Sequence, residues 1–349
     1  MRTFRGGMIV LVVVTLLSLS PQASGTIYTY RTLDYPGAVD TWATAISGGN
    51  VVGPYTDSSY RTRGFLWDGS SYRTLDYPGA LGTHVSAISG GNVVGNYCDA
   101  AYQYHGFLWD GSSYSKLQYP GGLGTYAWGI SGGTIVGHYV DISYDVHGFL
   151  WDDSSYTTLD YPGADQTSAT AISGGNVVGE YVSSSGAHGF FWNGSAYITL
   201  DYPGARKTSA TAISGGNVVG DYTDSSNHTH GFLWDGSSYT TIDPPGSGLT
   251  DPQAISGSNV VGYYFDAPLH TNGFLWDGSE YTTIDPPGST LTYAYGVDGD
   301  KVVGSYRDAT GGIHGFVAAP IPEPLTMLGM CLGVCGVGRY VRKRVKTRL

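Results

Sequence analysis

The sequence predicts an all-β protein, a closed seven-bladed β-propeller, from three observations. The phrase Gly-Phe-Leu-Trp-Asp-Gly returns with small changes at intervals of 41 or 42 residues, each interval holds four short extended runs, and the chain begins and ends part-way through a unit. The phrase starts at Gly64, Gly106, Gly148, Gly189, Gly231 and Gly273, with a truncated copy at Gly315. A regular period of this length indicates one repeated supersecondary unit, and four strands in about 42 residues are typical of a propeller blade.

The second unit shows the four runs, which we term A to D in chain order. Run A covers residues 86–88, run B 92–97, run C 106–109 and run D 114–117. A Ser-Gly-Gly turn separates A from B, and Asp-Gly-Ser-Ser separates C from D. Because glycine accepts positive φ without steric cost, both are predicted to be hairpin turns. No run has a helical period or the length of an ordinary helix.

The burial expected of each run differs. Runs B and C carry apolar residues at consecutive positions, such as Val51-Val52 and Phe65-Leu66-Trp67, which predicts strands buried on both faces between stacked sheets. Run A contains mostly small side chains, as expected of a strand near a central axis. Run D alternates polar and apolar residues, as expected of a more exposed edge strand. Tryptophan recurs at one position of run C, where we predict core rings, each contributing about 2 to 3 kcal/mol on burial. These tryptophans are Trp67, Trp109, Trp151, Trp192, Trp234 and Trp276.

The two ends of the repeat region complement one another. Residues 28–37 form a D run that lacks the preceding A, B and C runs, and the last unit has A at 293–297, B at 301–306 and C at 314–317 but no D. We therefore expect the N-terminal strand to pair with the C-terminal one and close the ring. An open β-array is the alternative, but it would need distinct caps at its ends.

The seven units make residues 26–320 one domain, and its charge is strongly acidic. The whole chain has 28 acidic and 17 basic side chains; one acidic and eight basic ones lie outside residues 26–320, which leaves 27 against 9, a formal charge of −18. Such a surface repels phosphate backbones and anionic lipid, so a nucleic-acid partner is not expected.

Both ends of the chain are predicted to be targeting segments. Arg2 and Arg5 precede an apolar stretch from residue 8 to 17, and Ala23-Ser24-Gly25 offers small residues for cleavage, which together indicate a secretory signal peptide over residues 1–25 and export by the Sec machinery. Residues 321–349 contain Pro322-Glu323-Pro324, an apolar stretch from 325 to 337 and a basic end. Positive charge after an apolar segment predicts a cytoplasmic tail and an external propeller. The tail includes Arg339, Arg342, Lys343 and Arg344.

This C-terminal arrangement resembles the PEP-CTERM sorting signal of exported bacterial proteins. The resemblance implies recognition by a membrane-embedded exosortase, cleavage near Pro322-Glu323-Pro324, and release or attachment at the cell surface. It also implies a Gram-negative bacterium that makes exopolysaccharide, and a place in its extracellular matrix or biofilm. The membrane contact would then be transient. A plain one-pass anchor is the alternative.

The repeats resemble the HAF family of extracellular repeats. That family pairs an isoleucine-led Val-Val-Gly segment with a His-Ala-Phe segment, and the corresponding pieces here are Ile88 through Gly95 and His105 through Trp109. Glycine replaces the alanine throughout, and Arg63 and Asn272 replace the histidine in two units. The resemblance covers nearly all of residues 27–318 and implies an exported repeat protein without an established catalytic residue.

Recurrent histidines and aspartates are predicted to be structural. A metal or acid–base site needs groups that converge on one point, whereas copies related by the ring are spread around it. We therefore predict hydrogen bonding within each blade, no cofactor and no metal site; calcium in the aspartate loops is the alternative, although none shows the carboxylate spacing of a known calcium loop. The Asp-Tyr-Pro-Gly group at Asp34, Asp76, Asp160 and Asp201 indicates Asx and turn chemistry. The other sets are His105, His147, His188, His230 and His314, and Asp57, Asp99, Asp141, Asp224, Asp266 and Asp308.

The differences between the copies are predicted to gather on one face. The A-to-B and C-to-D turns hardly vary, while the B-to-C and D-to-A loops differ in nearly every copy. In an antiparallel meander the two variable loops share one end of the blade. Loops on a rigid scaffold are where binding usually resides; drift on an unconstrained surface is the alternative. The candidate ligand residues, assigned to the D-to-A loops, are Trp42, His84, Tyr126, Arg206, Lys207 and Tyr293.

Two classes of function follow from this sequence. The first is a noncatalytic scaffold or binding module at the cell surface or in the matrix, which takes an extracellular polysaccharide or a surface protein through its variable face. The second is a secreted propeller enzyme, a glycosidase or lyase acting on polysaccharide. An enzyme should show units interrupted by unusual charged residues, and only Arg206-Lys207 and Ser183 approach this. We favour the binding module and predict no catalytic residue.

Overall fold

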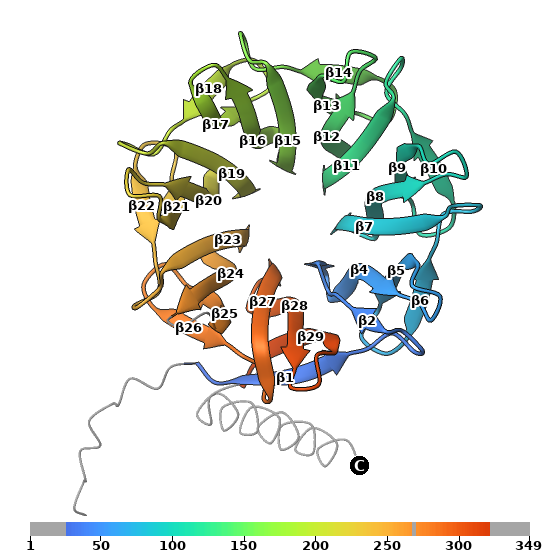
Figure 1. Cartoon of the computed structure of the whole chain (residues 1–349), viewed down its shortest axis with the longest axis vertical. Coiled ribbons are helices and arrows are strands. Elements are labelled where there is room, and N and C mark those ends of the chain that lie inside the picture. Colours follow the sequence, from blue (N-terminus) through green and yellow to red (C-terminus); the bar gives the residue numbers. More distant parts are fainter. Residues whose placement is uncertain (1–25, 267–269, 322–349) are drawn as a thin grey trace, which may run out of the picture.

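A computed structural model of the chain describes residues 26–266 and 270–321 and confirms the seven-bladed propeller. The sheets surround a central axis (Figure 1). Four blades are separate four-stranded sheets, one has its inner strand split in two, and the remaining two form an eight-stranded sheet joined by a single bridge between Thr271 and Leu291. Within each blade the strands form an antiparallel meander from the axis outwards.

The strands follow the blades in chain order. Blade 1 contains β2 (Asp40–Thr41), β3 (Ala45–Ser47), β4 (Asn50–Thr56), β5 (Thr62–Trp67) and β6 (Tyr72–Leu75); blade 2 β7 (Gly82–Ser89), β8 (Asn92–Cys98), β9 (Tyr104–Trp109) and β10 (Tyr114–Leu117). Blade 3 contains β11 (Gly124–Ser131), β12 (Thr134–Val140), β13 (Val146–Trp151) and β14 (Tyr156–Leu159); blade 4 β15 (Gln166–Ser173), β16 (Asn176–Ser183), β17 (Gly186–Trp192) and β18 (Tyr197–Leu200). Blade 5 contains β19 (Lys207–Ser214), β20 (Asn217–Thr223), β21 (Thr229–Trp234) and β22 (Tyr239–Ile242); blade 6 β23 (Leu249–Ser256), β24 (Asn259–Asp266), β25 (His270–Trp276) and β26 (Tyr281–Ile284). Blade 7 contains β27 (Ser289–Asp298), β28 (Lys301–Asp308), β29 (Ile313–Pro320) and β1 (Tyr28–Leu33).

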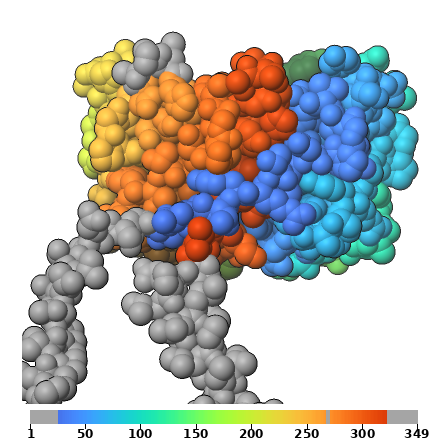
Figure 2. Space-filling view, turned by 90° about the horizontal axis from the view of Figure 1, so that it is seen from below, coloured from blue at the N-terminus to red at the C-terminus, as the bar shows by residue number. Residues whose placement is uncertain are grey.

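The ring closes as predicted, by pairing of the two ends of the repeat region. β1 runs antiparallel to β29, with Tyr28 opposite Pro320 and Leu33 opposite Gly315. Figure 2 shows the N-terminal segment in blue crossing the side of the C-terminal blade. The fully buried Leu33 of β1 packs with Phe65 of blade 1 and Val303 of blade 7, so the closing strand also joins the core between these blades.

The core lies between neighbouring sheets. Every blade buries one phenylalanine completely, on the strand that carries the repeated phrase, and valine, isoleucine and leucine side chains from its own blade and the adjacent one cluster with it. Trp67, Trp109 and Trp234 are buried, and Trp151, Trp192 and Trp276 pack against clusters while partly exposed, which confirms the predicted core position. The buried phenylalanines are Phe65, Phe107, Phe149, Phe190, Phe232, Phe274 and Phe316.

The innermost strands are longer than the sequence predicted, and this corrects the placement of several candidates. Run A was expected to begin at residue 86, but β7 begins at Gly82. His84, Tyr126, Lys207 and Tyr293 therefore lie on innermost strands rather than in D-to-A loops. The residues before the Ala-Ile segment are small, β-branched or polar, so they show no apolar pattern that would predict a strand. They form a strand because their backbone pairs with run B.

A bulge explains the glycine of the Val-Val-Gly segment. The register of β7 against β8 shifts between Val85 and Ala87, which turns the inner strand towards its neighbour. A methyl group on Gly95 would overlap with the carbonyl oxygen of His84. Equivalent carbonyls approach Gly53, Gly137, Gly179, Gly220, Gly262 and Gly304. Glycine is required at these positions because the backbone of the innermost segment leaves no space for a side chain.

The two ends of the blades differ in character, and we name them the constant face and the variable face. At the constant face, Gly90 and Gly91 form the A-to-B turn with φ of 57° and 99°, as expected of a type I′ hairpin. Asp68 closes the C-to-D turn by accepting hydrogen bonds from the backbone of Ser70 and Ser71, each at 2.8 Å. Tyr28 and Pro320 also lie at this end, since β1 and β29 pair there.

Several predicted segments lie outside the described residues. These are the signal peptide with Ala23 and Gly25, and the C-terminal signal with Pro322, Glu323, Pro324 and the basic tail. Within residues 26–266 and 270–321, no helix has the length and apolar character needed to cross a bilayer.

Candidate functional site

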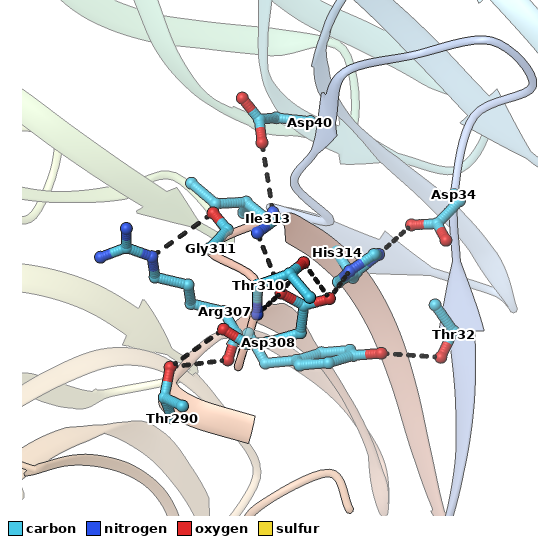
Figure 3. A network of polar contacts seen from close by, with 12 residues as sticks. Thr32, Asp34, Asp40, Thr290, Arg307, Asp308, Thr310, Gly311, Ile313 and His314 are labelled. Atoms are coloured by element: carbon cyan, nitrogen blue, oxygen red, sulfur yellow. Dashed lines mark hydrogen bonds and ion pairs between the residues drawn. The ribbon is translucent and has the colours of Figure 1, made fainter. Parts of the chain in front are cut away.

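Each recurrent histidine is held between two polar groups of its own blade. In blade 7, shown in Figure 3, His314 Nδ1 lies 2.9 Å from Asp34 Oδ1 and Nε2 lies 3.3 Å from Asp308 Oδ2. Partial burial lowers the pKa of His314, but the hydrogen bonds to Asp34 and Asp308 outweigh it and raise that pKa above its usual value. Because Asp34 belongs to the N-terminal segment, this bracket also fastens the closure of the ring.

The same bracket recurs around the ring and confirms the structural interpretation. His147 contacts Asp141 at 3.6 Å and Asp160 at 2.9 Å, and Arg63 takes the histidine position between Asp57 and Asp76. Related contacts join Asp224, His230 and Asp243; Asp99, His105 and Gln118; Ser185, His188 and Asp201; and Asp266 with Asn272.

The aspartates of the Asp-Tyr-Pro-Gly group act differently from the prediction. The turn itself is confirmed: Ala38 N donates to Tyr35 O at 3.0 Å, and Gly37 has a φ of 81°. The Asp34 side chain, however, binds His314 instead of capping this turn. The Asx interpretation was wrong because the histidine that competes for the carboxylate is distant in sequence.

The residues that differ most between blades form two rings around the central axis. The inner ring, one residue from each innermost segment, is Trp42, His84, Tyr126, Ser168, Ser209, Asp251 and Tyr293. The second ring stands opposite it, directly after Val-Val-Gly, and consists of Pro54, Asn96, His138, Glu180, Asp221, Tyr263 and Ser305. No second-ring residue type occurs twice. The blades thus repeat the same backbone structure but carry different side chains at these positions, near the axis and towards the variable face.

The second ring was missed by the sequence analysis, although the signal was present. The comparison of copies covers the turns and loops and leaves out the strands, yet the run-B position after the glycine changes in every copy. Aligning the seven copies residue by residue, instead of comparing loops with strands, would have identified it.

Carboxylates gather on the side of blades 4 to 6. Glu180 Oε2 lies 3.3 Å from Lys207 Nζ, and Tyr263 OH donates to Asp251 Oδ2 at 2.6 Å. Burial raises the pKa of Asp221 to about 6, with negative Asp251 and Glu180 adding to the rise and Lys207 opposing it. Burial likewise raises the pKa of Asp251.

Blade 3, next to blade 4 in the ring (Figure 1), places aromatic side chains near the axis. Trp128 Nε1 donates to His138 Nδ1 at 3.0 Å, and Ser168 Oγ lies 3.0 Å from the same nitrogen. Because an indole nitrogen can only donate, His138 Nδ1 accepts and the ring is neutral. Burial lowers the pKa of His138 to about 4, in agreement with that geometry.

The six predicted ligand residues are brought together only in part. His84 and Tyr126 share a cavity of about 340 Å³ with Trp128, and Trp42 and Tyr293 share another of about 280 Å³. Lys207 belongs to the carboxylate side. Arg206 is the exception, because it binds Asn227 Oδ1 at 2.7 Å on the rim and is outside both rings.

A cavity of about 430 Å³ lies on the axis between these groups, lined from six blades. Its walls include Thr44, Ser86, Trp128, Thr170, Thr211 and Gln253. In the part of the chain that the structure describes, no three His, Cys, Asp or Glu residues are placed to hold a metal ion together. The arrangement offers aromatic surfaces, neutral hydrogen-bonding groups and a carboxylate side, which is the composition of a binding site.

Solved structures share this fold. The propeller domain of the Trilobed protease from Pyrococcus furiosus matches 82% of this chain and 98% of its own at 12% identity, with a TM-score of 0.61. That domain is described as having an open Velcro topology, whereas β1 and β29 pair here. A puromycin hydrolase matches 80% of this chain but only 55% of its own, at 12% identity and a TM-score of 0.55.

A six-bladed fungal lectin from Aleuria aurantia matches 71% of this chain and 96% of its own, at 15% identity and a TM-score of 0.43. No family model and no curated protein matches the sequence. The likenesses to the protease domain and the hydrolase, both with TM-scores above 0.5, establish the β-propeller fold.

Proposed function

We propose that this protein is an exported, noncatalytic binding module that takes an extracellular polysaccharide or a surface protein at the axial end of its variable face. The observation that carries the proposal is the pair of rings around the axis. Seven blades repeat their core, turns and histidine brackets, yet the second ring differs in every blade. A rigid scaffold that presents such residues in several cavities near its axis is suited to recognition.

The proposed place of action is the cell surface or extracellular matrix. It is supported by the HAF-like repeats, the secretory signal over residues 1–25 and the PEP-CTERM-like tail over residues 321–349, which would engage the Sec machinery and an exosortase. The paired ends Tyr28 and Pro320 lie at the constant face. A tail that holds the protein at a membrane would thus leave the variable face pointing outwards.

A secreted enzyme acting on polysaccharide is the second candidate, and one observation favours it. Glu180, Lys207 and Asp221 lie on one side of the axis, and a carboxyl group with a pKa of about 6 suits a general acid. The binding module remains preferred because, apart from Glu180, Asp221 and Asp251, the two rings consist of aromatic and uncharged polar residues and one proline.

Retention on immobilised polysaccharide separates these functions. The full chain is passed over gels carrying neutral and acidic extracellular polysaccharides, and soluble sugar is measured after incubation. Retention without sugar release supports the binding module; release that Asp221→Asn abolishes supports the enzyme. A chain that neither binds nor cleaves any polysaccharide, and captures no protein from the surface fraction of an exopolysaccharide-producing cell, contradicts both.

Processing tests the sorting proposal separately. Replacing Pro322, Glu323 and Pro324 by alanine should leave the C-terminal segment attached, because the exosortase would lose its recognition sequence. Mass spectrometry of the exported protein measures the end point. If the wild type and the variant carry the same C-terminus, the sorting proposal is wrong while the binding proposal stands.

A further inference from the structure

A crevice over blade 2 opens on the variable face between the rim and the axis. Its volume is about 340 Å³, near the lower end of the range of about 300–1,000 Å³ found for ligand sites. Tyr104, Tyr126 and Trp128 line it. The ring centroids of Tyr104 and Tyr126 are 5.6 Å apart with planes at 26°, and those of Tyr126 and Trp128 are 6.3 Å apart with planes at 9°. The rings thus follow one another from the rim to the axis, and Tyr104 is 47% exposed.

Glycine at position 82 leaves this crevice open. Gly82 stands opposite Cys98 at the start of its inner strand; blade 3 also has glycine there, Gly124, whereas blades 4, 5 and 6 carry Gln166, Lys207 and Leu249. The backbone does not require glycine here, because a methyl group would meet Thr62 O at 3.5 Å and Thr62 Cβ at 4.0 Å, both ordinary contact distances, and φ is not positive. The absence of a side chain at position 82 therefore leaves room in the crevice.

The other lining side chains are polar and uncharged. They are Thr62, Thr83, His84, Asn96 and Cys98, without a carboxylate, lysine or arginine among them. Burial lowers the pKa of His84, which keeps its ring neutral at neutral pH. Asn96 is buried and oriented, since its Oδ1 accepts from Ala127 N at 2.8 Å.

We propose that this crevice is the subsite for one neutral pyranose ring of an extracellular glycan, an inference that rests on the proposed binding function. A pyranose has an apolar C–H face, which gains from contact with aromatic carbon, and a rim of hydroxyl groups, which need hydrogen-bond partners when buried. The crevice offers both kinds of surface. A uronate or sulfated sugar fits it poorly, because the domain of residues 26–320 has a formal charge of −18 and the lining holds no cation.

Variants that copy other blades test the subsite without disturbing the fold. Gly82→Gln and Tyr126→Ser each install a residue that another blade already carries, Gln166 and Ser168 respectively. The probes are dextran, mannan and galactan, with alginate as the acidic polymer and a proline-rich peptide as the protein arm. Titration of the full chain should show at least tenfold weaker binding of a neutral glycan in both variants. Tyr144→Ser, which removes an exposed tyrosine from the B-to-C loop of blade 3 outside the crevice and both rings, should stay within twofold of the wild type.

The outcomes separate the subsite from the proposed function. Neutral-glycan binding that Gly82→Gln leaves unchanged, or that Tyr144→Ser weakens equally, places the ligand elsewhere on the variable face and overturns the subsite alone. Binding of only alginate or only the peptide overturns it too. A wild type that binds none of the probes contradicts the subsite and the proposed polysaccharide function together, while a surface protein captured by the full chain would still support the binding module.

Cys98 provides a second readout inside the crevice. It is the free cysteine of the described residues, and peptide mapping distinguishes it from Cys331 and Cys335. Burial and Asp99 raise the pKa of its thiol, so iodoacetamide labelling is measured at pH 9. A saturating neutral glycan should slow labelling of Cys98 at least threefold in the wild type. An unchanged rate under saturation overturns the placement of the sugar in this crevice.

Discussion

Asp221 carries a carboxyl group whose ionisation the folded protein opposes. Its folded-state pKa of about 6 lies above the usual value because of burial, with Asp251 and Glu180 adding repulsion. A carboxyl group with a raised folded-state pKa stabilises the fold below its unfolded pKa of about 4, and that contribution is lost as pH rises through about 6.

Asp221→Asn should therefore stabilise the protein at pH 7. The expected gain in the free energy of unfolding is about 1 to 3 kcal/mol at pH 7 and close to zero at pH 4. Urea denaturation at both pH values measures it. Asp68→Asn is the control, for which the opposite dependence of stability on pH is expected, because turn hydrogen bonds lower the pKa of Asp68. Asn193 fills the same position in blade 4. A pH-independent effect of Asp221→Asn would contradict the raised pKa.

The contribution of His138 to the stability of the fold should fall as pH falls, because folding lowers the pKa of this histidine. Its folded-state pKa of about 4 lies below the unfolded value of about 6.5, so its contribution is present above pH 6.5 and is lost as pH falls towards 4. NMR titration of the imidazole should give a pKa below 5. Trp128→Phe removes the indole donor and should raise that pKa only slightly, since burial is the main cause. A pKa near 6.5 in the wild type would contradict the buried geometry.

At the level of single residues, the sequence was informative where the copies agree. His105 and Asp99 have counterparts at fixed positions in most blades, and a residue that recurs around the ring belongs to the blade, so their structural role could be predicted. Asn96, Glu180 and Asp221 could not be found in this way, because they lie within a strand whose neighbours are constant. Only the register across two strands shows that they share the axis with His84 and Asp251.

The innermost strand and its bulge are the elements that constrain the repeat most closely. The four runs per blade could be predicted, since the turn glycines mark their ends. The start of the inner strand could not, because residues 82–85 pair through their backbone to β8 and carry no apolar alternation of their own. This four-residue difference moved His84 and Tyr126 from a loop to the wall of the axis.

Gly95→Ala should destabilise the protein strongly. A methyl group there has no space, since the carbonyl of His84 and the backbone of Val85 occupy it. Forcing two strands apart is expected to cost about 3 kcal/mol or more in the free energy of unfolding. The urea midpoint measures the loss. Gly82→Ala is the matched control, with ordinary contact distances, and should shift the midpoint little. Equal shifts in the two variants would contradict the close approach.

The whole molecule depends on one strand that is distant in sequence from its blade. β1 covers the edge of β29 and places Leu33 in the core, while Arg31 lies over the Trp67 ring of blade 1 at 4.7 Å. The closure could be predicted from the broken first and last units. Its reinforcement by Asp34, His314 and the Arg31 contact depends on side chains that meet only in the closed ring.

Deleting residues 26–33 should open the ring and cause self-association. The deletion removes the buried Leu33, a loss of about 2 to 3 kcal/mol by itself, and exposes the backbone of β29 as a free edge. Light scattering after size-exclusion chromatography should find dimers or larger species, and the melting temperature should fall. Arg31→Ala keeps the strand while removing the contact with Trp67, and it should remain monodisperse like the wild type. If the deleted chain has the same mass distribution and melting temperature as the wild type, the closing strand does not hold the ring, and the stability of the propeller must come from the interfaces between the other six blades.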